Sequence, residues 1–146
     1  MVIFFPSDTF INDFAPLARA ACEKWGEEYG ICPELLESIA YEESRYTADA
    51  KSKDGSCLGL MQIHKASHKQ RIKNLEIKDL YDIDDNVQVA TDYLAELFEE
   101  YEEVSTVLMI YHGEKDAVRK GEQGIVSKYA KQVLKRSEAL ERQHGK

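Results

Sequence analysis

Hydrophobic residues recur every three to four positions along most of the chain, which is the spacing of one face of an α-helix. Two prolines stand where helices can begin, because proline is tolerated at the first helical position. A first helix is predicted from Pro16 to a stop at Gly30, and a second from Pro33 to about Ser44. Their apolar stripes are Leu17, Ala21 and Trp25 in the first helix, and Leu35, Leu36, Ile39 and Ala40 in the second.

The second half of the chain predicts three longer helical segments. The clearest begins near Asp84 or Asp85, either of which can cap it, and runs to about Tyr101. A shorter helix is predicted from Val104 to Tyr111, and a last helix closes the chain. The apolar positions that support these helices are Val87, Ala90, Leu94 and Leu97, then Val107 and Leu108, and finally Tyr129, Val133 and Leu140.

The segments between these helices lack a helical period. Residues 45–58 are polar and contain an Asp-Gly pair, so they predict a loop, and residues 113–124 predict a second loop that contains glycine. A short helix is expected to start near Gly59. The one candidate strand is the MVIFF start, because no other segment alternates with a period of two for long enough. The sequence therefore predicts a mainly α fold.

Length, composition and charge limit the classes of protein that fit. The 146 residues are 43% hydrophobic and 32% charged, which predicts one soluble globular domain over residues 1–146. The 27 acidic and 19 basic residues give a net charge of −8, which argues against nucleic acid or an anionic membrane as the main partner. No window approaches the roughly 20 apolar residues of a membrane span, and the N-terminus lacks the features of a signal peptide. We expect a monomer.

Neither the cysteines nor the histidines show the spacing of a metal site. The three cysteines are odd in number and lack a CxxC pair, so free and mostly buried thiols are expected. Three of the histidines are expected to be exposed side chains without trusted ligand partners, although two of them are four residues apart. No metal or organic cofactor is predicted. These residues are Cys22, Cys32 and Cys57, and His64, His68 and His144.

One acidic residue falls on the apolar face of the second predicted helix. With Leu36 at zero and about 100° per residue, the apolar stripe averages about −30° and Glu43 falls at about −20°. Glu42 lies about 90° away from the stripe, and Glu34 and Glu37 lie on the opposite side. Burial disfavours the charged form of a carboxyl and raises its pKa, which is how a general acid for glycoside cleavage is made.

Two interpretations of Glu43 are compatible with this placement. In the first, Glu43 is a buried acid that can donate a proton near neutral pH. In the second, its side chain turns past the helix end, or an arginine such as Arg45 or Arg71 holds it, because residues at a helix end leave a stripe easily.

The residues that follow Glu43 resemble a family motif. The segment ESRYTADAKSKDGSCLGLMQIH is similar to the motif of the lytic transglycosylases with the soluble-transglycosylase fold, relatives of goose-type lysozyme. Later segments around Asn86, Tyr111 and Tyr129 are similar to further helices of that family, so the resemblance spans about residues 30–135. The motif positions are Glu43, Ser44, Tyr46, Ala50, Ser52, Gly55, Gly59, Leu60, Met61, Gln62 and Ile63.

The resemblance implies a lysozyme-like helical domain with a cleft around the helix-terminal Glu43. It also implies a reaction, non-hydrolytic cleavage of the β-1,4 bond between N-acetylmuramic acid and N-acetylglucosamine in peptidoglycan strands. Glu43 would protonate the glycosidic oxygen and then take a proton from the muramoyl 6-hydroxyl, which leaves 1,6-anhydro ends. The residues implied to orient this acid or to contact the glycan are Ser44, Met61, Gln62, Tyr111, His112 and Tyr129.

His112 departs from the family pattern, because asparagine is usual at this position, although histidine keeps a donor and an acceptor. Two other functions stay open. A hydrolytic lysozyme of the same fold needs a second acid, and a non-catalytic helical module would bind glycan or a protein of a phage or conjugation assembly. The loop acids that are candidates for the second acid are Asp49, Asp54, Glu114 and Asp116.

The resemblance also implies action on the bacterial cell wall. Because the chain shows no signal peptide, we expect the protein to reach the wall from a phage, by another delivery system, or after removal of a leader.

Overall fold

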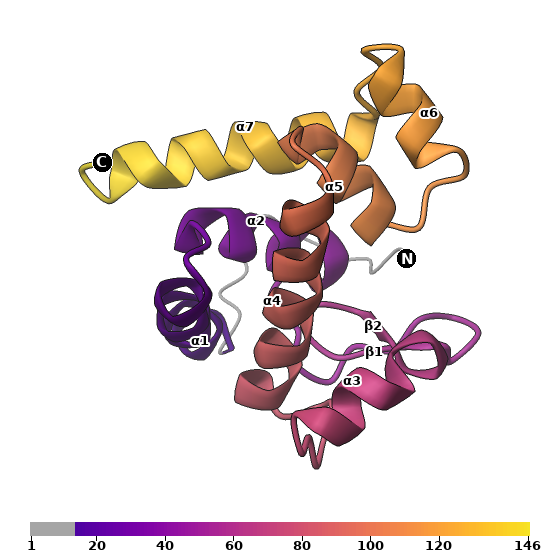
Figure 1. Cartoon of the computed structure of the whole chain (residues 1–146). Helices are drawn as coiled ribbons and strands as arrows, with labels where there is room; N and C mark the ends of the chain where they lie inside the picture. The colour runs from indigo at the N-terminus through magenta and orange to yellow at the C-terminus, as the bar shows by residue number, and fades with distance from the viewer. Residues whose placement is uncertain (1–13) are drawn as a thin grey trace.

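The computed structural model describes residues 14–146, which form seven α-helices, a short 3-10 helix and a two-stranded sheet (Figure 1). The predicted mainly α fold is confirmed, and the candidate strand in the MVIFF start lies outside the described residues. The elements are α1 (Ala15–Tyr29), α2 (Pro33–Ser44), β1 (Cys57–Leu58), β2 (Ile63–His64), η1 (Lys65–His68), α3 (Lys69–Asn74), α4 (Ile83–Glu100), α5 (Val104–Tyr111), α6 (Ala117–Glu122) and α7 (Lys128–Gln143).

Helix α2 is the central element of the fold. It packs against both α1 and α7, and α1 packs in turn against α4. Figure 1 shows α7 crossing above α2 and the upper end of α4. Nine of the twelve residues of α2 are buried, so this helix has hardly any side left to solvent. Its fully buried apolar residues are Leu36, Ile39 and Ala40.

The ends of the first two helices follow the prediction. Each has proline at its start, and Gly30 ends α1 in the left-handed conformation, with φ of 69°. Helix α1 is then held on α4 by side-chain hydrogen bonds. The indole Nε1 of Trp25 donates to Asp84 at 3.1 Å, and the hydroxyl of Tyr29 donates to Asp92 at 2.9 Å.

The start of α4 corrects the predicted cap. Neither Asp84 nor Asp85 is the capping residue, because Asp82 has the extended backbone of a cap and its carboxylate accepts from the Asp85 N–H at 2.9 Å. Three aspartates in four positions made the choice ambiguous, since each can accept from the first turn. The helix itself and the shorter α5 have the predicted positions.

The helix predicted near Gly59 is wrong. Residues 59–62 form turns that join β1 to β2, and the first helical residues after them begin at η1. Gly59 and Gln62 have φ of 79° and 54°, a left-handed conformation that a right-handed helix does not contain. A Cβ on Gly59 would lie 2.2 Å from the Asn86 side chain, so the turn requires glycine.

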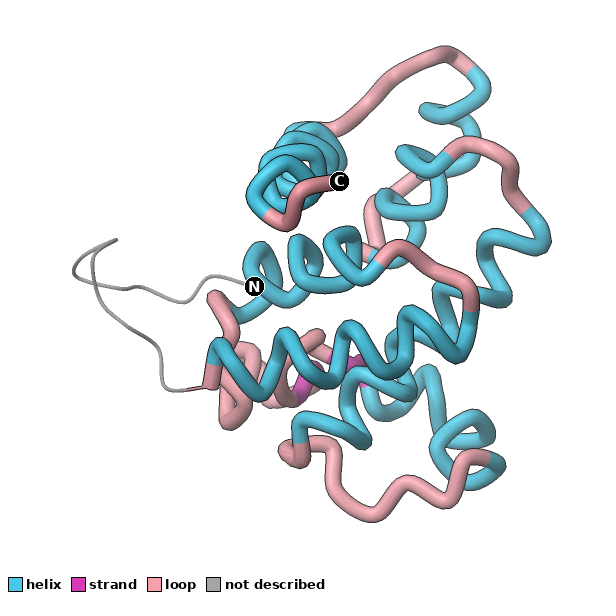
Figure 2. Tube along the Cα trace, turned by 90° about the vertical axis from the view of Figure 1, so that its left-hand side faces the viewer, coloured by secondary structure: helices cyan, strands magenta, loops and turns pink. Residues whose placement is uncertain are grey.

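The predicted loop over residues 113–124 contains a helix, α6, and this prediction is therefore wrong in part. Helix α6 is six residues long, too short for its apolar positions to establish a period. The loop predicted over 45–58 is mostly loop, but its last two residues form β1, which pairs with β2. Figure 2 shows how small this sheet is beside the helices.

None of the helices between residues 14 and 146 combines the length and the apolar character of a membrane-crossing segment. The three cysteines are free thiols, but the expectation that most are buried is wrong, because only Cys22 is buried while Cys32 and Cys57 are partly exposed. Cys32 precedes the first residue of α2, and Cys57 is the first residue of β1.

Candidate active site

Glu43 lies in the last turn of α2 and is 8% exposed. The hydroxyl of Tyr129 on α7 donates a hydrogen bond to Glu43 Oε2 at 2.8 Å. The predicted place of Glu43 on the buried face is thus confirmed, and the alternative in which it turns past the helix end is wrong. Arg71, one of the two arginines considered as its partner, pairs with Asp92 and Glu96 of α4.

Burial raises the pKa of the Glu43 carboxyl above its usual range. The hydrogen bond from Tyr129 and the charge of His112 act in the opposite direction, because both favour the carboxylate, but burial outweighs them. Burial and the nearby Glu43 charge also raise the pKa of the Tyr129 hydroxyl, which keeps it a donor. The Glu43 carboxyl is therefore able to carry a proton at a pH where exposed carboxyls are ionised.

An open cleft of about 530 Å³ lies in front of this acid. Its walls come from the end of α2, from β2 and η1, and from α4 and α5. Four of the residues expected at the site line it. These are Glu43, Gln62, Tyr111 and His112.

Gln62 lines this cleft and carries a buried acceptor without a partner. Its left-handed backbone turns the side chain back, and Nε2 donates to the carbonyls of Gly59 at 2.9 Å and Ala50 at 3.3 Å. Its amide oxygen Oε1 is buried and has no hydrogen-bond partner. A buried acceptor without a partner is costly, so it favours a ligand that brings a donor.

A stack of two rings forms the wall beside Glu43. The imidazole of His112 lies on the ring of Tyr129, with centroids 3.8 Å apart and planes at 13°. His112 Nδ1 is 3.2 Å from Glu114 Oε2, and the Ser127 hydroxyl donates to that same oxygen at 2.7 Å. The histidine is therefore held between Glu114 and the tyrosine that contacts the acid.

Tyr111 supports the cleft floor. Its hydroxyl donates to the carbonyl of Met61 at 2.8 Å, and its ring lies 5.7 Å from that of Tyr93. Burial raises its pKa well above the usual value. Because its hydroxyl is already used, Tyr111 offers a substrate mainly its ring.

Three of the expected residues do not line the cleft, and one of them, Tyr129, contacts Glu43 from α7 instead. Met61 is fully buried, so the expectation that its thioether lines the cleft is wrong; its N–H donates to Asn86 Oδ1 at 2.8 Å, which turns it into the core. Ser44 is also buried, and its hydroxyl donates to the carbonyls of Leu60 at 2.7 Å and Ala40 at 3.2 Å. Ser44 therefore joins the end of α2 to the turn that carries Gln62.

A comparison with protein families places this geometry in context. A family model described as the transglycosylase SLT domain matches residues 20–133, which is more than half of the chain. The chain belongs to the transglycosylase SLT family. The family is one of lytic transglycosylases that act on peptidoglycan in the cell wall. No curated protein matches the chain significantly.

The SLT domain has cleft residues that sequence reasoning missed. The predicted exposure of His68 is wrong, because its ring packs 4.5 Å from that of Tyr93 and burial lowers its pKa. His64 is exposed as predicted, yet it borders the cleft and its Nδ1 lies 2.6 Å from the Ser67 hydroxyl. The four-residue spacing of the two histidines was their only signal. Arg71 also lines the cleft.

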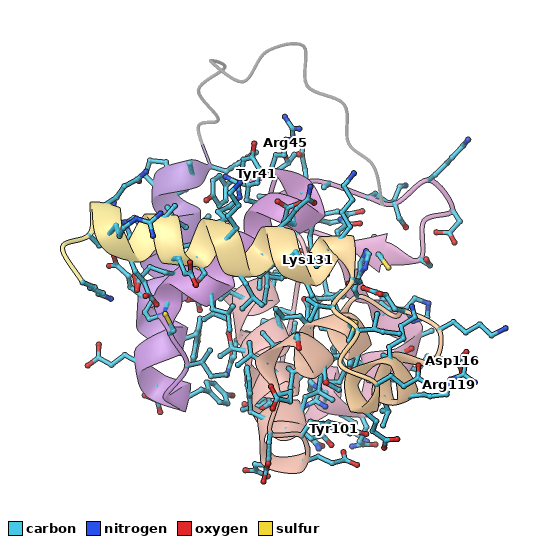
Figure 3. All side chains as sticks on the ribbon, turned by 90° about the horizontal axis from the view of Figure 1, so that it is seen from above. Tyr41, Arg45, Tyr101, Asp116, Arg119 and Lys131 are labelled. Carbon is cyan, nitrogen blue, oxygen red and sulfur yellow. The ribbon has the colours of Figure 1, made fainter. Side chains whose placement is uncertain are left out.

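The acids considered as a second carboxylate do not line this cleft, and Glu43 is the one carboxylic acid among the described residues that do. Asp54 is held in its own turn by Ser56, and Asp116 pairs with Arg119 at 2.8 Å on the outer side of α6 (Figure 3). The remaining two are Asp49, which is exposed, and Glu114, which binds His112 and Ser127.

Within residues 14–146, the side chains grouped closely enough to hold a metal ion lie away from the cleft. Both groups contain Glu34, at the start of α2. No residue that lines the cleft belongs to either.

Proposed function

We propose that this SLT domain cleaves the β-1,4 bond between N-acetylmuramic acid and N-acetylglucosamine without water, with Glu43 as the single acid and base. The observation that carries this proposal is that Glu43 is the one carboxylic acid among the described cleft residues, and that its burial raises its pKa. A hydrolytic glycosidase needs two carboxyl groups on either side of the bond.

In the first step, Glu43 donates its proton to the glycosidic oxygen while the bond from that oxygen to C1 of the muramoyl sugar breaks. The N-acetylglucosamine side leaves with the proton and the bonding electrons. The raised pKa of Glu43 supports this role, because a proton must still be present near neutral pH.

In the second step, the Glu43 carboxylate takes the proton from the 6-hydroxyl of the same muramoyl sugar, and O6 forms the new bond to C1. The 1,6-anhydro ring closes, and no water enters the balance. The hydrogen bond from Tyr129 to Glu43 Oε2 favours the carboxylate between the two steps.

Other residues would position the strand. The free acceptor Gln62 Oε1 suits the N–H of an N-acetyl group, and the rings of Tyr111 and His112, which line the cleft, suit sugar rings. Ser44 is a positioning residue that fixes the end of α2. We propose that the protein acts as a monomer on glycan strands of the cell wall.

The decisive experiment is mass analysis of the products released from purified peptidoglycan. We expect muropeptides that end in 1,6-anhydro-muramic acid and incorporate no ¹⁸O when the digest is run in H₂¹⁸O. Reducing muramic acid ends that carry ¹⁸O would show a hydrolytic lysozyme instead. The wild-type protein could also release no products and still sediment with peptidoglycan. In that case the domain is a binding module and the proposal is wrong.

A further inference from the structure

A second group of chemically reactive side chains lies at the opposite end of α2 from Glu43. Ligand atoms of Glu34, Glu37 and His144 are all within 4.8 Å of one another, and Cys32 and Glu141 form an overlapping group through Glu34. The first two residues come from the start of α2 and His144 from the end of α7, which lie on the same side of the molecule (Figure 1).

Glu37 is the member of this group whose bonding is incomplete. It is only 4% exposed, and its oxygen Oε2 is buried with no hydrogen-bond partner. The nearest cation to its other oxygen is Arg19, whose Nε lies 3.8 Å from Oε1. Burial raises the pKa of Glu37, with no partner strong enough to reverse the effect. A buried carboxylate oxygen without a partner indicates a missing ligand.

The neighbouring acid is satisfied by groups that are able to move. Glu34 is 2% exposed, and both its oxygens contact the ammonium of Lys146, at 2.8 and 3.1 Å. His144 Nδ1 lies 3.1 Å from Glu34 Oε2. The Lys146 side chain is 54% exposed, so it can leave for solvent when another cation binds Glu34.

The donor set selects the kind of cation. Two carboxylates and an imidazole, with a thiol nearby, suit Zn²⁺ and related transition-metal ions better than Ca²⁺ or Mg²⁺, which take oxygen ligands. Zinc binds such atoms at about 2.0–2.2 Å, which separates neighbouring ligands by about 3–4 Å. The 4.8 Å limit on the three ligand atoms requires only small side-chain adjustments.

We propose that Glu34, Glu37 and His144 form a structural site for one divalent transition-metal ion of the zinc type. The ion gives the buried Glu37 oxygen its partner and replaces the Lys146 ammonium on Glu34. It joins the first turn of α2 to the end of α7, whose residues are about 110 positions apart in the chain. The sequence predicted no metal here because the ligands share no local spacing.

The test is a titration of chelator-treated protein with Zn²⁺, followed by calorimetry and by thermal unfolding. We expect one ion per chain and a rise in Tm of about 9 °C when free Zn²⁺ is about 100 times its Kd. Glu37→Gln and His144→Ala should each weaken binding by more than about 100-fold, which exceeds the usual loss of an outer-shell partner. The matched control is Glu27→Gln, an exposed acid on α1, which should leave the Kd unchanged.

A further variant separates a metal site from a merely structural cluster. Lys146→Ala should tighten Zn²⁺ binding several-fold, because it removes the ammonium that competes for Glu34. Circular dichroism and melting of each metal-free variant establish that it is folded. The proposal is overturned if stoichiometric binding is absent, if binding survives Glu37→Gln and His144→Ala, or if only His64→Ala with His68→Ala removes it, which would place the ion in the cleft. It is also overturned if Lys146→Ala does not tighten binding.

Discussion

The two ends of α2 both bury carboxyl groups, but they surround them with different partners. At the first turn, Glu34 contacts the ammonium of Lys146 and the ring of His144. At the last turn, Glu43 contacts the hydroxyl of Tyr129. Glu43 is 8% exposed and lines the cleft. The carboxylate at the first turn therefore contacts a lysine ammonium, whereas the carboxyl at the last turn contacts a neutral hydroxyl donor.

This difference determines which carboxyl can act as an acid. Burial would raise the pKa of Glu34, but hydrogen bonds from Lys146 and His144 outweigh burial and hold the pKa below its usual value. At Glu43, burial outweighs the single hydrogen bond from Tyr129, and the pKa is raised. Burial alone therefore does not make a catalytic acid; the absence of a close cation among its contacts matters as much.

The largest expected effect separates the two ends by activity. Glu43→Gln keeps the shape of the side chain but removes its proton, so the rate of peptidoglycan cleavage should fall by about 100-fold or more. The measurement is turbidity loss of purified walls together with product mass analysis. An equally active variant would show that the reaction does not use this acid.

The same substitution should not destabilise the fold. A group whose folded pKa is raised stabilises the protein fully below its unfolded pKa, and this contribution is lost as pH rises towards the folded pKa. At neutral pH the wild-type protein carries this cost and Glu43→Gln does not, so the variant should melt at the same or a higher temperature. A lower Tm at neutral pH would contradict this view of Glu43.

The next largest effect on the cleavage rate is expected at Tyr129, the neutral donor to Glu43. Tyr129→Phe removes the hydrogen bond that favours the Glu43 carboxylate, so the pKa of Glu43 should rise further and proton donation in the first step should slow. We expect a rate about tenfold lower, in line with the net value of one hydrogen bond to a charged group, and a high-pH limb of the rate profile shifted upward. An unchanged pH profile with a lower rate would indicate a packing effect only.

A substitution at the first turn of α2 should change the stability of the protein rather than its activity. Glu34→Gln, measured in chelator, leaves His144 and Lys146 without their anion and should lower the free energy of unfolding by about 1–3 kcal/mol. Its cleavage rate at a temperature where it stays folded should remain within about twofold of wild type. Denaturant unfolding and wall lysis test the two halves of this prediction, and a large loss of rate would show that the two ends of α2 are coupled.

The smallest effect is expected at the wall beside Glu43. His112→Asn introduces the residue that the family resemblance implies at this position, and it removes a charge that lowers the pKa of Glu43. The high-pH limb of activity should move upward, with a change of at most about threefold in the maximal rate. A rate profile over pH 5–8 measures this shift.

Local spacing was sufficient for most of the fold and for the central residue of the site. The helical period predicted α1, α2, α4, α5 and α7, and it placed Glu43 on the buried face. It failed at residues 59–62, where two left-handed positions end any helix, and the family resemblance failed at Met61, which the turn directs into the core. Both failures arise because Asn86, from a distant helix, holds this turn by its own hydrogen bonds.

The sequence by itself determined five of the helices (α1, α2, α4, α5 and α7), the position of Glu43 on the apolar stripe and the family motif, because these depend on neighbours within one or two turns. Only the tertiary structure decided what each buried acid contacts. Tyr129 is 86 residues from Glu43, and Lys146 is 112 residues from Glu34. The side of α2 that was predicted to be polar, with Glu34 and Glu37, is buried because α1 and α7 cover it. The local pattern of a helix does not determine which of its sides the neighbouring helices will cover.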